Sequence, residues 1–83
     1  MNVSICTYEI NEKNLIGDDG RKYTAYGVDC FEVENGFKRL VNQIIDVSVS
    51  LSEMQKFIDT LNSSNLSSAH LYDAVNDFIC LVN

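Results

Sequence analysis

The sequence has no proline, no tryptophan and one histidine, and its six basic residues face twelve acidic ones. The absence of proline and of low-complexity tracts argues against a proline-rich linker, and 46% hydrophobic residues are enough to form a core. No apolar run approaches the roughly 20 residues that a membrane-spanning helix needs. The first ten residues, MNVSICTYEI, lack the basic start and apolar run of a signal peptide. We therefore expect a single domain, residues 1–83, in the cytoplasm.

The shortage of basic residues also restricts the partners. The net charge is −6, and the basic residues include only two short pairs, Arg21-Lys22 and Lys38-Arg39. These pairs do not form the basic stripe that neutralises phosphates, so we expect neither a nucleic-acid partner nor a membrane partner. An acidic surface suits a basic protein partner, or serves only to keep the chain in solution.

The motifs of common enzymes and metal sites are missing as well. Cys6, Cys30 and Cys80 are odd in number and far apart, without a Cys-x-x-Cys pair, so we expect free and mostly buried thiols and no zinc site. The sequence contains no Gly-x-Ser-x-Gly motif and no glycine-rich phosphate loop. We therefore expect no enzyme activity and no cofactor.

Three segments in the first half read as strands. Residues 3–10 are rich in β-branched and aromatic residues, and this first strand has Ile16 as its furthest limit. The glycines of Gly17-Asp18-Asp19-Gly20 predict a turn before the second strand, residues 21–33. Gly27 inside that strand predicts a bulge or a close backbone approach. The third strand is expected over residues 38–49.

The Asn35-Gly36 pair predicts a two-residue type I′ turn, which fixes the register of the second hairpin. If Glu34 pairs with Phe37, then Glu32 lies opposite Arg39, Cys30 opposite Val41, and Tyr26 opposite Ile45. The predicted buried face consists of Tyr26, Val28, Cys30, Val41, Ile45 and Val47, joined by Cys6, Tyr8 and Ile10 from the first strand. The opposite face carries Phe31, Leu40 and Ile44, either partly covered or as an exposed patch.

The hydrophobic period changes to that of a helix at Ser50. The sequence Ser50-Leu-Ser-Glu53 is a capping box that starts a helix over residues 51–62, and the polar run of residues 62–65 ends it. Its predicted apolar face is Leu51, Met54, Phe57, Ile58 and Leu61. A second helix over residues 67–82, with Ser67 as cap, has the apolar stripe Leu71, Val75, Phe78, Ile79 and Val82. The sequence thus predicts an α+β fold: a three-stranded antiparallel β-sheet (two hairpins) followed by a C-terminal antiparallel helical hairpin packed on one face.

His70, Asp73 and Asp77 are spaced three and four residues apart on the second helix, roughly opposite or at the edge of its apolar stripe. A metal site on one helix needs ligands from a second element, and no second histidine exists. A His–Asp pair acting as a general base needs a nucleophile and an oxyanion hole. We therefore interpret the trio as a partner-contact surface or as a solvated helix face, and not as a metal or catalytic site.

Residues 22–79 resemble a small uncharacterised family of low-GC Gram-positive bacteria. The shared features are Tyr26-Gly27, the segment Ile44-Ile45-Asp46-Val47-Ser48, and a closing L-S-x-x-H-L-x-D-x-V-x-D-F helix that begins at Leu66. The resemblance implies a bacterial, cytoplasmic protein, and it places His70, Asp73 and Asp77 in the recurring closing motif. The proline that often precedes the histidine is replaced here by Ser68-Ala69. The family is a domain of unknown function and supplies no substrate or cofactor.

Three hypotheses for the function follow. The first is a non-enzymatic, small acidic protein-interaction or regulatory module. The second is a phage or mobile-element inhibitor whose carboxylates mimic the charge of nucleic acid. The third is a metal-binding domain centred on His70. Because a three-stranded sheet has two open edges, we also expect a homodimer through a sheet edge or through the Phe31, Leu40 and Ile44 face.

Overall fold

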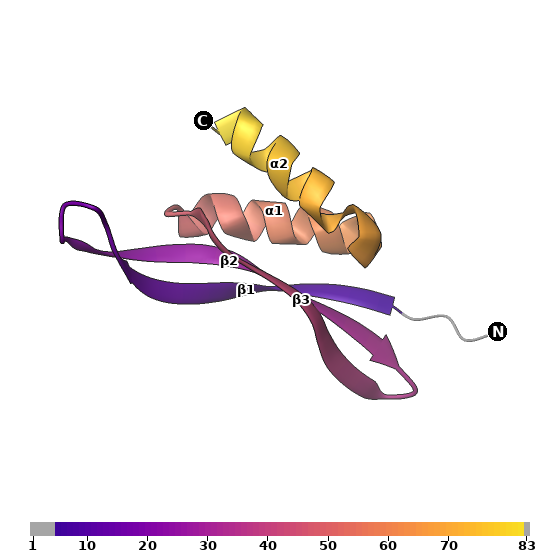
Figure 1. The fold of residues 1–83 in the computed structure, drawn as a ribbon. Helices are drawn as coiled ribbons and strands as arrows, with labels where there is room; N and C mark the ends of the chain where they lie inside the picture. The colour runs from indigo at the N-terminus through magenta and orange to yellow at the C-terminus, as the bar shows by residue number, and fades with distance from the viewer. Residues whose placement is uncertain (1–4, 83) are drawn as a thin grey trace.

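The computed structural model describes residues 5–82. Three antiparallel strands, β1 (Ile5–Ile16), β2 (Lys22–Glu34) and β3 (Phe37–Ser48), form one sheet in the order β1-β2-β3. The helix α1 (Leu51–Ser63), a 3₁₀ turn η1 (Ser68–His70) and the helix α2 (Leu71–Val82) follow (Figure 1). The predicted sheet followed by helices is confirmed. Residues 3 and 4, the predicted start of the first strand, lie outside the described residues.

Both predicted hairpin turns are present. In the first, the Gly17 N–H donates to the Arg21 carbonyl at 2.8 Å, and Gly20 has a φ of 79°. In the second, Asn35 and Gly36 have φ values of 52° and 80°, as a type I′ turn requires. Because both turns hold long strands in register, β1 extends through Ile16 and pairs along its whole length with β2.

The predicted register of β3 holds near the turn and then fails. Glu34 pairs with Phe37 and Glu32 with Arg39, but Cys30 lies opposite Asn42, and Tyr26 lies opposite Ser48. The cause is two irregularities in β3, since each unmatched residue reverses which side chains face the core.

The changed register moves three apolar side chains from their predicted faces. Val41 and Ile45, predicted to be buried, are 37% and 46% exposed. Ile44, predicted on the opposite face, packs against the core instead. The predicted Phe31, Leu40 and Ile44 face is therefore wrong in its third member, and Phe31 is partly covered by Lys38, whose Nζ lies 4.2 Å from the ring centre.

The second irregularity lies where β3 passes very close to β2. A Cβ atom on Gly27 would meet the carbonyl oxygen of Ile44, and would lie 2.8 Å from both Asn11 Oδ1 and the Cα of Ile45. Asn11 Nδ2 donates to that same Ile44 carbonyl at 3.2 Å and to Asp29 Oδ1 at 2.9 Å. The predicted close backbone approach at Gly27 is confirmed, and the Asn11 side chain bridges the strands there.

The helix α1 lies along the sheet and supplies much of the core. Ser50 is its N-cap, because Ser50 Oγ accepts from the Glu53 N–H at 3.3 Å. The Ser50 N–H donates to Ser48 Oγ at 3.1 Å, so Ser48 takes the role that the capping box assigns to the Glu53 carboxylate. Three of the five predicted apolar side chains, Met54, Ile58 and Leu61, are buried against the sheet, where they pack with Tyr8, Val28 and Cys30. Phe57 is half-buried. Leu51, predicted on this face, is 43% exposed.

The last turn of α1 is joined to the edge of β1 by a side chain. Asn62 Oδ1 accepts from the Tyr8 N–H at 2.9 Å, and Asn62 Nδ2 donates to the Tyr8 carbonyl at 3.0 Å. The Tyr8 hydroxyl donates to the Leu66 carbonyl at 2.6 Å. The Asn62 amide thus pairs with β1 as a residue of a fourth strand would, and it occupies part of that sheet edge.

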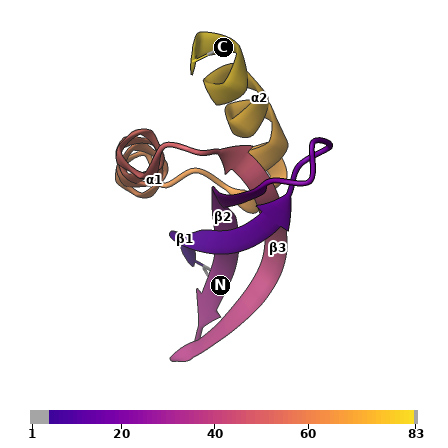
Figure 2. The same cartoon turned by 90° about the vertical axis from the view of Figure 1, so that its left-hand side faces the viewer.

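The second helix starts later than predicted and leaves the sheet. Ser67 precedes η1 but forms no side-chain cap, and α2 itself begins at Leu71. Leu71, Val75 and Phe78 are buried, as the predicted stripe requires, whereas the Val82 side chain lies outside the described residues. Figures 1 and 2 show α2 diverging from α1. The predicted packing of an antiparallel helical hairpin on one face is therefore not confirmed.

Candidate partner-binding surface

The histidine and the two aspartates of the closing helix lie on its exposed side. His70 ends η1, Asp73 lies in the first turn of α2, and Asp77 follows one turn later, and all three are exposed. Within residues 5–82, no three histidine, cysteine, aspartate or glutamate side chains are placed to hold a metal ion. Asp77 alone of the three also reaches the space between the two helices.

That space is a groove of about 500 Å³, which we call the α1–α2 groove. Phe57 and Phe78 stack in it with ring centres 4.4 Å apart and planes inclined by 19°. Leu81, which is 86% exposed, extends the apolar wall along α2. Its charged lining residues are Glu53, Lys56 and Asp77. The divergence of α2 from α1 therefore leaves Leu81 and part of Phe57 exposed beside an acidic helix, while Phe78 is buried beneath them.

The sequence reasoning missed this groove. The predicted stripe does not include Leu81, although Leu81 lies three residues after Phe78 and seven after Ala74, the spacing of one helix face. That spacing continues through Asp77, so the stripe was available in the sequence. No local sequence pattern predicts the angle between the helices, and that angle keeps the stripe uncovered.

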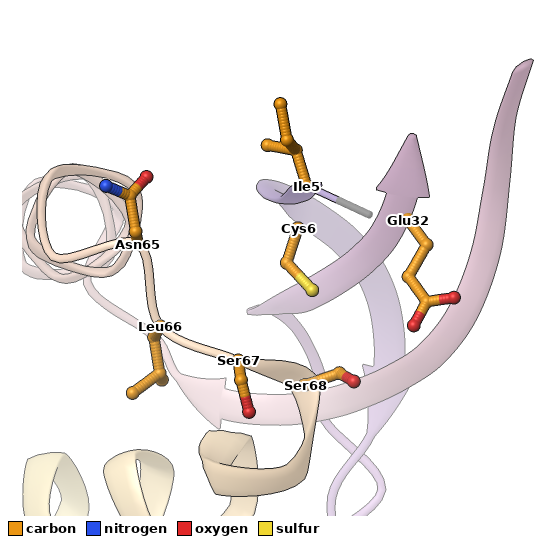
Figure 3. Close-up of a pocket in the computed structure, with 7 residues that line it drawn as sticks. All are labelled: Ile5, Cys6, Glu32, Asn65, Leu66, Ser67 and Ser68. Carbon is orange, nitrogen blue, oxygen red and sulfur yellow. The ribbon is translucent and has the colours of Figure 1, made fainter. Parts of the chain in front are cut away.

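A second hollow, of about 540 Å³, lies between the start of β1 and the loop that joins the helices. Figure 3 shows the Cys6 sulfur pointing toward the loop residues Ser67 and Ser68, with Glu32 at the side, while the Ile5 side chain points away from the loop. The single histidine of the sequence is not among the residues that line this hollow, which include Ser67, Ser68 and the Glu32 carboxylate. The described lining of the hollow is more apolar than polar.

The three thiols differ in exposure. Cys30 is buried, Cys6 is partly buried at the hollow just described, and Cys80 is exposed, so the prediction of mostly buried thiols is wrong for Cys80. Burial, and next the neighbouring Cys6 thiol, raise the pKa of Cys30 above its ordinary value. A raised pKa leaves little thiolate at neutral pH, which is the opposite of what a nucleophilic cysteine needs.

The buried hydroxyl of Tyr8 gives the fold a dependence on alkaline pH. Burial, reinforced by the nearby Cys30 and Cys6 thiols, raises the pKa of Tyr8 above its ordinary value of 10.0. The folded chain therefore holds this proton at a pH where the unfolded chain releases it, so the contribution of Tyr8 to stability is complete below pH 10 and falls above it. We expect Tyr8→Phe to cost about 1 kcal/mol near pH 8 through the lost bond to the Leu66 carbonyl.

The same variant should lose stability less steeply at high pH. One linked proton contributes at most about 1.4 kcal/mol per pH unit to the slope. Urea unfolding at pH 8 and at pH 11 measures this difference between Tyr8→Phe and the wild type. Equal alkaline slopes in the two proteins would contradict the assignment to Tyr8.

Comparison with known proteins identifies the family and no closer relative. No curated protein and no solved structure matches the chain. Among the residues that the structure describes, no helix has both the length and the apolar character to cross a membrane. One family model, described as a family of unknown function (DUF6514), matches residues 1–81. The chain therefore belongs to this family of unknown function, DUF6514.

Proposed function

We propose that the protein is a non-enzymatic interaction module of the bacterial cytoplasm that binds a basic protein partner. The observation that carries the proposal is the open apolar α1–α2 groove beside an exposed acidic helix. An apolar surface bordered by charged residues is typical of a protein-binding site. His70, Asp73 and Asp77 form the polar part of the contact surface, and the proposal involves neither a cofactor nor a metal.

The electrostatics of the helices support a basic partner. The chain has no basic residue after Lys56 except the single histidine, and neither helix has a basic residue in its last turn. The carbonyl ends of α1 and α2 therefore lack the cations that their dipoles favour. A partner that brings lysine or arginine supplies these cations and neutralises the carboxylates of α2.

The test replaces Asp73 and Asp77 together with asparagine. We expect the unfolding free energy to change by less than about 0.5 kcal/mol, because both side chains are exposed. Binding of the partner should weaken and lose part of its salt dependence, since two carboxylates are removed. Affinity capture from the native cell, with wild-type and double-variant bait at two salt concentrations, measures the effect.

Two results would reject this proposed function. The first is a set of captured proteins that is identical for both baits. The second is a result that favours the metal hypothesis: stoichiometric zinc raises the melting temperature of the wild type but does not raise that of His70→Ala. A helix that held a metal through His70 would give the second result.

A further inference from the structure

We propose that the α1–α2 groove binds one amphipathic helix that carries basic residues on its polar side. This inference rests on the proposed function and names the site and the structural class of the bound segment. The groove has the required chemistry, because its floor is the Phe57–Phe78 stack and its border holds two carboxylates and one lysine. The two helices that line it diverge from each other (Figures 1 and 2).

The positions that line the groove point to a helix as the occupant. On α1 and its C-cap they include Glu53, Phe57, Thr60 and Ser64, and on α2 they include Ala74 and Leu81. Separations of three, four and seven residues are those that face a neighbouring helix in ridge-and-groove packing. The α1 side runs from residue 53 to residue 64, which is about 16 Å at 1.5 Å per residue. A helix of about three turns would fill that length.

The charges favour a basic partner over a second copy of this chain. A second copy would bring its own helices, and α2 carries Asp73 and Asp77 without a lysine or arginine. The chain as a whole has a net charge of −6, so two copies repel each other. The only basic residue on α1 is Lys56, which already lies 3.9 Å from Glu53. A basic helix would instead find the Asp77 carboxylate at the border of the groove, together with Glu53, which it would share with Lys56.

The sheet edges are less suited to this role. The Asn62 amide occupies the Tyr8 backbone groups on β1, and β3 has two irregularities. The Gln43 N–H on β3 is also taken by Asn42 Oδ1 at 2.9 Å. Bulges and covered backbone groups are the means by which edge strands resist pairing with another chain. The groove, with Leu81 at 86% exposed, is an apolar surface that lacks such protection.

The experiment uses a synthetic amphipathic peptide of about 18 residues, or five helical turns, with leucine on one face and lysine on the other. A matched peptide carries glutamate in place of every lysine. We expect the lysine peptide to bind the full chain, and its NMR shift changes to centre on Phe57, Ala74, Phe78 and Leu81. Leu81→Asn should weaken binding about tenfold, because an apolar anchor is lost. Leu51→Asn, a control at an exposed leucine outside the groove, should leave binding unchanged.

Lys56→Gln removes the one positive charge that lines the groove and should strengthen binding of the lysine peptide about twofold to threefold. Equal binding of the glutamate peptide would overturn the basic character of the occupant. Shift changes outside the groove, or equal affinity of Leu81→Asn and Leu51→Asn, would overturn the site. A concentration-dependent dimer whose shift changes fall on the groove would show that a second copy is the occupant and would also overturn the inference.

The same variants separate this inference from the proposed function. A native partner that is lost with the Asp73 and Asp77 double variant but retained by Leu81→Asn leaves the interaction module in place and removes the groove. A partner that binds both the double variant and Leu81→Asn as it binds the wild type would contradict the proposed function and the groove inference alike. A partner lost with both variants, while Leu51→Asn keeps it, supports both.

Discussion

Gly27→Ala should remove most of the stability of the fold near room temperature, with an expected loss of about 3–5 kcal/mol. The new methyl group would overlap the Ile44 carbonyl and press on Asn11 Oδ1 and the Ile45 Cα at 2.8 Å. Two of these three neighbours are backbone atoms, so no side-chain rotation can relieve the overlap. β3 would have to move away from β2, which would also break the bond from Asn11 Nδ2 to the Ile44 carbonyl.

The loss is large relative to the total free energy of unfolding. Domains are stable by only about 5–15 kcal/mol, and a domain of 83 residues lies at the low end of that range. Urea unfolding followed by circular dichroism measures the change. The control is Gly17→Ala, whose methyl group would meet mainly the movable Asp19 carboxylate at 3.1 Å, so its cost should stay below about 1 kcal/mol. A Gly27→Ala midpoint equal to that of Gly17→Ala would show that the strands are not in close contact.

The same crossing explains where prediction from the sequence stopped. Asn35-Gly36 specifies its turn locally, so the pairs next to it, such as Glu32 with Arg39, were predictable. Beyond Leu40 the register changes twice, first between Phe31 and Cys30 and again where β3 passes Gly27 of β2, and the second change depends on a contact between segments far apart in the chain. Gly27 itself was a signal, but a glycine does not say which residue of the partner strand is displaced.

The helices show the same division between local and distant determinants. The cap at Ser50 and the apolar stripe of α1 are encoded within a few neighbouring residues and were predictable. The angle at which α2 leaves α1 depends on the packing of Phe57 against Phe78, 21 residues later in the chain, and no pattern within one helix specifies it. The groove could therefore not be predicted from the sequence, although most of the side chains that line it could be assigned to a helix face.

Asn62 is the clearest residue whose role depends on a distant contact, and replacing it should give the second large effect. In the sequence it is the first member of a polar run that ends a helix, but in the structure it bonds with both backbone groups of Tyr8, 54 residues away. We expect Asn62→Ala to cost about 1–2 kcal/mol, because two hydrogen bonds are lost while alanine gains some helix propensity. Asn76→Ala, at an exposed position of α2, is the matched control and should cost nothing measurable.

Asn62→Asp tests whether both bonds matter. A carboxylate accepts from the Tyr8 N–H as the amide does, but it repels the Tyr8 carbonyl instead of donating to it. Its stability should therefore be no higher than that of the wild type at pH 7 and should rise relative to the wild type as acid protonates the carboxyl group.

The alanine variant, Asn62→Ala, should also self-associate more readily at high concentration, because the Tyr8 backbone groups on the β1 edge become free to pair with another strand. Sedimentation that finds Asn62→Ala no more associated than Asn76→Ala, together with equal urea midpoints for the two, would show that the side chain does not protect this edge.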